Sequence, residues 1–139
     1  MAGNLFVLAI LVCGLLVLSA CVPSSPENLV PERCIVDMGL GCEEFSIKGS
    51  QVSMKLINYY DERVEIRNVT LSSDKGACYF NPAQPLEVEA GSDTLIVVND
   101  CAWLEGMKGE RARISVETVY FRGADFDRFA KGEITGRVQ

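Results

Sequence analysis

The sequence of 139 residues predicts an all-β fold, an antiparallel β-sandwich preceded by one amino-terminal hydrophobic helix. Three observations support this prediction. An uninterrupted apolar run stands at the amino terminus, short alternating runs follow it with turn signals about every 8–12 residues, and no helical pattern is evident beyond residue 22. Strands of this kind, about seven to nine in number, are typical of an immunoglobulin-like sandwich.

The apolar run extends from Leu5 to Leu18, and every charged side chain lies beyond Val22. The run is apolar on all sides, whereas a segment of a globular core would show helical or strand periodicity. It therefore predicts that residues 1–22 form a hydrophobic helix directed to the membrane, as a signal peptide or a signal anchor. The stretch from Leu5 to Val22 would measure about 27 Å as a helix, close to the minimum for a bilayer.

Leu18-Ser19-Ala20-Cys21 follows the apolar run and resembles the lipobox of prokaryotic lipoproteins. This resemblance implies that the chain is cleaved before Cys21 and that the Cys21 sulfur carries a lipid. In the alternative, the segment is retained as a signal anchor and Cys21 is a thiol inside the membrane. A freely secreted product is the third outcome.

Residues 23–33 contain three prolines and two serines, a composition typical of a stiff, extended tether. The sequence thus divides into an anchor at 1–22, a Pro-rich linker at 23–33 and an extracytoplasmic β-sandwich domain at 34–139. The last of these is long enough to bury one core of modest size.

Four cysteines lie in the predicted domain, namely Cys34, Cys42, Cys78 and Cys101. An even number in a small exported domain predicts two disulfide bonds, for which three pairings exist. We favour Cys34–Cys42, which brackets a glycine-containing turn, and Cys78–Cys101, which would join neighbouring strands. A zinc site is disfavoured because the closely spaced C-x-x-C pairs that hold zinc are missing.

The alternation of apolar residues predicts individual strands. It slips by one residue near Asn68, between the Val64–Ile66 pair and the Val69–Leu71 pair, which predicts a β-bulge. The continuous apolar run from Thr94 to Val98 is typical of a buried central strand. The alternation from Ala112 to Tyr120 predicts the longest strand, and Trp103, Ile134 and Val138 are expected in the core.

The layout of the chain resembles small archaeal envelope proteins. The features that carry this resemblance are the apolar segment, the Pro-rich tether, Cys34-x7-Cys42-x-x-Phe45, a later cysteine pair and Gly132-x-Ile134-x-Gly136-x-Val138. Some such proteins are pilin-like, with a hydrophobic helix in a filament core and a β-sandwich outside. This chain departs from them because it has no prepilin-peptidase site of the basic-residue–glycine type, and its apolar segment ends at Pro23.

The composition excludes several classes of function. A net charge of −6 argues against nucleic acid as a partner, since phosphates require clustered Lys and Arg. The absence of histidine removes Ser–His and Cys–His catalysis and His-ligated zinc or haem. We therefore predict no catalytic residues, no metal site and no cofactor. Asp125, Asp127 and Glu133 could offer oxygen ligands to calcium, but a solvated hairpin tip is favoured over a calcium site.

Asn68-Val69-Thr70 is an N-x-[ST] sequon, so Asn68 is a candidate for N-glycosylation in an exported domain. An unmodified strand residue beside the bulge is the alternative.

Two functions remain. The first is a non-enzymatic, membrane-anchored protein at the cell surface with a structural or interaction role, its sandwich displayed outside the membrane. The second is a pilin-like filament subunit whose amino-terminal helix packs in a filament core. The expected partners are the membrane, through residues 1–22, and either copies of the chain itself or other envelope proteins.

Overall fold

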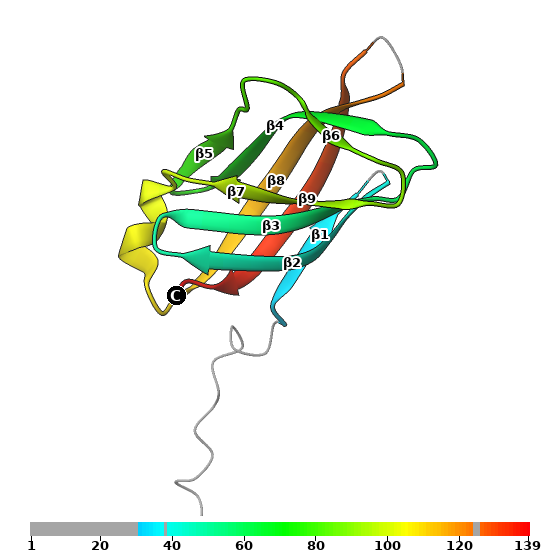
Figure 1. The fold of residues 1–139 in the computed structure, drawn as a ribbon. Coiled ribbons are helices and arrows are strands. Elements are labelled where there is room, and N and C mark those ends of the chain that lie inside the picture. Colours follow the sequence, from blue (N-terminus) through cyan, green and yellow to red (C-terminus); the bar gives the residue numbers. More distant parts are fainter. Residues whose placement is uncertain (1–30, 38, 124–125) are drawn as a thin grey trace, which may run out of the picture. The chain divides into compact units, whose positions relative to one another are not determined.

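The computed structural model describes residues 31–37, 39–123 and 126–139, and Pro31–Gln139 forms one compact unit (Figure 1). The predicted hydrophobic helix, Cys21 and most of the Pro-rich linker lie outside the described residues. Within the described part of the chain, no helix is long and apolar enough to cross a membrane.

The described residues form nine β-strands and one short 3-10 helix, so the prediction of an all-β fold is confirmed. The strands are β1 (Arg33–Val36), β2 (Leu40–Lys48), β3 (Gln51–Asn58), β4 (Val64–Ser73), β5 (Gly76–Phe80), β6 (Leu86–Val88), β7 (Asp93–Val98), β8 (Arg111–Arg122) and β9 (Arg128–Arg137), and the helix is η3 (Ala102–Met107).

The strands form two antiparallel sheets that lie face to face (Figure 1). The larger sheet has the order β1-β9-β8-β4-β5, and β6 pairs with β4 beside β5; the smaller sheet has the order β2-β3-β7. A constant immunoglobulin domain has the orders ABED and CFG. The orders β9-β8-β4-β5 and β7-β3-β2 of this protein match ABED and CFG only when the chain is traced backwards from β9 to β2. Strands β1 and β6 are additions to that pattern. The layers are therefore as predicted, but the chain visits the strand positions in the reverse order.

The core lies between the sheets, because each strand sends alternate side chains inward. In β8, the longest strand, Ile114, Val116 and Tyr120 are buried while the residues between them are more exposed. The register of β4 against β8 shifts between Ile66 and Asn68, so the predicted bulge is confirmed. The expected core residues Ile134 and Val138 are also buried.

Trp103 lies on η3 and packs against the edge of the core, as expected of an anchor. Its indole covers Gly76 at the start of β5, where a Cβ atom would lie 2.8 Å from the indole Cδ1. The helix and the β4–β5 turn are thereby held together.

The prediction for Thr94–Val98 is wrong in one respect. This segment forms β7, an edge strand of the smaller sheet and not a central one, and Leu95 is 64% exposed. Ile96 and Val98 are buried as the apolar run implies, but Leu95 projects from the outer face of the sheet. A continuous apolar run indicates that side chains on both faces of a strand are suited to burial. It does not specify whether the strand is paired with a neighbour along each of its edges.

Candidate interaction surface

Both predicted disulfide bonds are present. Cys34 is joined to Cys42 with their Cα atoms 5.5 Å apart, and Cys78 to Cys101 with their Cα atoms 5.1 Å apart. The pairing was predicted, but the expectation that Cys78 and Cys101 join neighbouring strands is wrong. Each bond connects the larger sheet with the smaller one, and the two bonds lie at opposite edges of the sandwich. Cys34–Cys42 joins β1 to β2, and Cys78–Cys101 joins β5 to the segment that follows β7.

The acids weighed as calcium ligands have other partners or lie outside the described residues. Asp125 is outside them, and Asp127 lies 4.0 Å from the Arg67 guanidinium. Glu133 is held by Arg113 at 2.5 Å and by Arg33 at 3.0 Å, and these hydrogen bonds lower the pKa of its carboxyl below the usual value. In the described ranges, no group of three or more Cys, Asp and Glu side chains is placed to hold a metal ion.

Asn68 lies at the bulge of β4, partly exposed and opposite Val119 of β8. Its neighbours on the outer face of the larger sheet are therefore apolar on the β8 side, where Val119 in turn lies opposite Phe129 of β9.

Asn58, at the end of β3, is a fully buried polar residue that organises one end of the sandwich. Its Nδ2 donates to the carbonyl oxygens of Glu62, Val88 and Glu89 at 2.8, 3.0 and 3.2 Å, and its Oδ1 accepts from the Tyr60 amide at 2.9 Å. A buried amide with every bond made fixes its partners in place, because breaking any bond leaves a desolvated polar group. Asn58 thus joins the β3–β4 loop to the strand end at β6.

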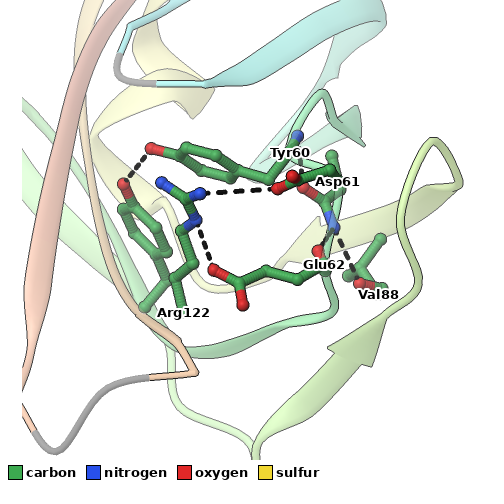
Figure 2. A network of polar contacts seen from close by, with 7 residues as sticks. Tyr60, Asp61, Glu62, Val88 and Arg122 are labelled. Atoms are coloured by element: carbon green, nitrogen blue, oxygen red, sulfur yellow. Dashed lines mark hydrogen bonds and ion pairs between the residues drawn. The ribbon is translucent and has the colours of Figure 1, made fainter.

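A second set of contacts connects this loop to the end of β8 (Figure 2). The Tyr60 hydroxyl lies 2.8 Å from the buried Tyr120 hydroxyl, and burial together with this hydrogen bond raises the pKa of Tyr120 to about 12. The Arg122 guanidinium stacks over the Tyr60 ring at 4.1 Å and forms ion pairs with Glu62 at 2.6 Å and Asp61 at 3.4 Å.

These contacts differ in strength. Exposed ion pairs contribute roughly 0–1 kcal/mol, whereas leaving a buried hydrogen-bonding group unpaired costs roughly 1–3 kcal/mol. Asn58 and the tyrosine pair therefore set the geometry of the loop, and the two carboxylates orient Arg122 on it.

Three Arg–aromatic pairs gather at this same end of the larger sheet. Besides Arg122 over Tyr60, Arg67 lies 4.0 Å above the Phe121 ring, and Arg128 lies 5.0 Å from the Phe126 ring centre. Each such contact is worth about 0.5–1 kcal/mol at an exposed site. Of the three, the Arg67–Phe121 pair lies on the outer face of the larger sheet, whereas Arg122 and Arg128 lie opposite the buried Val64 and Tyr120.

Two phenylalanines in this region remain exposed to solvent. Phe126, between β8 and β9, is 60% exposed, and Phe129 at the start of β9 is 53% exposed. Phe129 faces outward beside Val119, in the row next to Phe121. We define the hairpin-end surface as the outward or exposed side chains at the β8–β9 hairpin end of the larger sheet: Arg67, Val119, Phe121, Phe126 and Phe129.

The hairpin-end surface lies at the end of the sandwich opposite the point where the described chain begins (Figure 1). Arg33, the first residue of β1, pairs with Thr135 near the far end of β9, while Arg128 begins β9 at the hairpin. Seven residues of extended strand separate these positions along β9, about 23 Å at 3.3 Å per residue.

This surface could not be recognised from the sequence. Arg67 and Phe121 belong to different strands far apart in the chain, and only the sheet register brings them together. The available signal was the density of Phe and Arg between residues 121 and 129, in a segment we interpreted as a solvated hairpin tip.

No protein-family model and no curated protein sequence matches the chain. Among solved structures, the chain is similar to the C-terminal domain of Wzt, with a TM-score of 0.43, 12% sequence identity and coverage of 78% of each chain. It is also similar to a protein from Archaeoglobus fulgidus, with a TM-score of 0.29, 15% identity and coverage of 79% of this chain and 98% of that one. Likenesses at this level carry no argument about function.

Proposed function

We propose that this chain is a non-enzymatic, membrane-tethered module of the cell surface whose sandwich binds another envelope protein through the hairpin-end surface. The observation that carries the proposal is that the Arg67–Phe121 pair lies at the same end of one sheet as two exposed phenylalanines, Phe126 and Phe129. Aromatic residues and arginine are enriched in the centres of protein interfaces. A cluster of them is therefore a stronger indication of a binding surface than a single exposed apolar residue.

The proposed location follows from chemistry at two places in the chain. Two disulfide bonds that clamp both edges of a small domain suit an oxidising, extracytoplasmic compartment. The apolar run ahead of the Pro-rich linker supplies the membrane attachment, either as a retained helix or through a lipid on Cys21. The archaeal and pilin-like character suggested by the layout is part of this proposal, and the filament subunit is its alternative form.

A photo-cross-linking amino acid at Phe129 tests the interaction surface in the full chain in its own membrane. We expect one discrete product with a second protein. The same probe at Lys48, exposed on the other sheet near the opposite end, should give no such product. Phe126→Asp should abolish the Phe129 product, whereas Tyr79→Asp, at an equally exposed position on β5, should leave it unchanged.

The outcomes separate the hypotheses. A product from Phe129 whose mass is a multiple of this chain, repeated as a ladder, would favour the filament subunit. No product at Phe129, or the same product from Lys48, would contradict a role for the hairpin-end surface.

A further inference from the structure

The outer edge of β7 is unlike the other strand edges of the sandwich. In the part of the chain that the structure describes, no strand pairs with β7 on the side away from β3 (Figure 1). The strand reads DTLIVV, without lysine, arginine or proline, and its register against β3 is continuous, without a bulge. An exposed, flat, apolar edge of this kind is a template for pairing with another strand.

The remaining edge strands carry the features that prevent such pairing. The opposite edge of the smaller sheet, β2, has a register shift between Cys42 and Phe45, with Glu43 and Glu44 at the shift and Lys48 at its end. The edges of the larger sheet are short, with four residues in β1, five in β5 and three in β6. Bulges, charges and short strands all discourage edge-to-edge association.

The backbone groups that face the free edge can be assigned from the pairing with β3. The Asn58 amide donates to the Ser92 carbonyl at 2.9 Å, and hydrogen-bonded pairs alternate along an antiparallel ladder. Residues 94, 96 and 98 therefore bond to β3. The amides and carbonyls of Asp93, Leu95 and Val97 point to the open side.

We propose that β7 pairs with β7 of a second copy of this chain, antiparallel and with Ile96 at the two-fold axis, so that the two smaller sheets become one continuous sheet. In this register, Leu95 of each copy lies opposite Val97 of the other, on the outer face. Both belong to the set whose backbone groups point outward, so they exchange hydrogen bonds directly. The contact uses the same patch in both copies, as a closed dimer requires.

The ends of the strand fit the same register. Asp93 lies opposite Asn99 of the second copy, so the two like charges do not meet. Gln51 Nε2 donates to Asn99 Oδ1 at 2.8 Å, which leaves the Asn99 Nδ2 group to donate to the Asp93 carboxylate across the interface. A register centred on Leu95 would instead place Asp93 opposite the apolar Val97.

The dimer is expected to be weak in dilute solution, because a six-residue strand pair buries less than the roughly 1,200–2,000 Å² of a standard interface. Tethering both copies to one membrane raises their effective concentration.

Native mass spectrometry of the full chain, held at high protein concentration in detergent, tests the pairing. We expect dimers for the unchanged chain, monomers for Leu95→Lys, and dimers for Tyr79→Lys, which places the same charge at a similarly exposed edge position on β5. Dimers that persist in Leu95→Lys, a monomeric unchanged chain, or loss of dimers in both variants would each overturn the proposal.

Amide hydrogen exchange of the unchanged chain gives a second test that needs no substitution. The amides of Leu95 and Val97 should exchange slowly at high protein concentration and fast on dilution, while those of Ile96 and Val98, bonded to β3, stay slow throughout. Fast exchange of the Leu95 and Val97 amides at every concentration would contradict pairing at β7. Both readouts are independent of any cross-link at the hairpin-end surface, so the two proposals can fail separately.

Discussion

Asn58 shows how one buried side chain sets the shape of a surface some distance away. Its amide holds three carbonyl groups and one backbone amide, from the β3–β4 loop and from the end of β6. Tyr60 in that loop contacts both Tyr120 and Arg122. The placement of Tyr60 and Arg122 therefore depends on a residue that is itself completely inaccessible.

Replacing Asn58 should destabilise the fold. We expect Asn58→Ala to lower the free energy of unfolding by about 3 kcal/mol, since the carbonyls it serves lose their donor in a buried site. Denaturant unfolding with both disulfides intact measures the change. Asn81→Ala, at an exposed position, should change the free energy by less than about 0.5 kcal/mol. Equal effects at the two positions would mean that Asn58 does not organise this end.

Tyr120 provides a pH-dependent prediction. Its pKa is raised from 10.0 to about 12, first by burial and then by the hydrogen bond with Tyr60. A raised folded pKa means that the stabilisation is fully present below pH 10 and is lost as the pH rises toward the folded value. Absorbance titration of the four tyrosines should show one that ionises near pH 12, and Tyr120→Phe should remove that step. A titration unchanged by Tyr120→Phe would refute the assignment.

At the scale of elements, the two disulfides fasten the sheets together at both open edges. The chain-entropy model gives about 2.6 kcal/mol for the loop closed by Cys34–Cys42 and about 3.5 kcal/mol for the longer loop closed by Cys78–Cys101. We expect the Cys78→Ser/Cys101→Ser variant to lose more stability than Cys34→Ser/Cys42→Ser, by about 1 kcal/mol. Thermal and denaturant unfolding would show the order, and the reverse order would contradict the loop-length argument.

Two glycines explain how β9 can pack closely against β1 and β2. A Cβ atom at Gly132 would lie 2.1 Å from the Ile35 carbonyl oxygen, so only glycine lets β1 approach at this position. At Gly136 a Cβ atom would lie 2.5 Å from the Phe45 ring of β2. In the sequence Gly132-x-Ile134-x-Gly136, the two glycines thus leave space for β1 and for Phe45 of β2, and Ile134 between them is a buried core residue.

Local patterns in the sequence were sufficient to predict most strands. Alternation predicted β8, and the slip of phase near Asn68 predicted the bulge, because both are properties of a single segment. Cysteine spacing predicted the two pairings. The neighbours of each strand could not be predicted, and β7 was therefore wrongly expected at the centre of a sheet. For the same reason, Cys101 was expected on a strand next to that of Cys78, whereas it follows the end of β7.

The hairpin-end surface was beyond prediction from the sequence because it is a product of register. The pairing of β4 with β8 brings Arg67 to Phe121, and the pairing of β8 with β9 brings Val119 to Phe129. Neither contact leaves a periodic signal in any one segment. A search for apolar patterns also assigns aromatic residues to the core, and it therefore overlooks those that are exposed.

At the scale of the whole molecule, the sandwich has two ends with different roles in the proposed function. The chain enters at the Arg33 end, and the Arg–aromatic surface lies at the hairpin end. Clamps at both edges keep the sheets together between them.

The most direct test of an extracytoplasmic, membrane-tethered module is the intact mass of the protein in the membrane fraction, with thiols alkylated before and after reduction. We expect Cys34, Cys42, Cys78 and Cys101 to be alkylated only after reduction, in a chain that starts at a lipid-modified Cys21 or retains the apolar segment. An unlipidated chain in the soluble fraction, with these four thiols free before reduction, would contradict it.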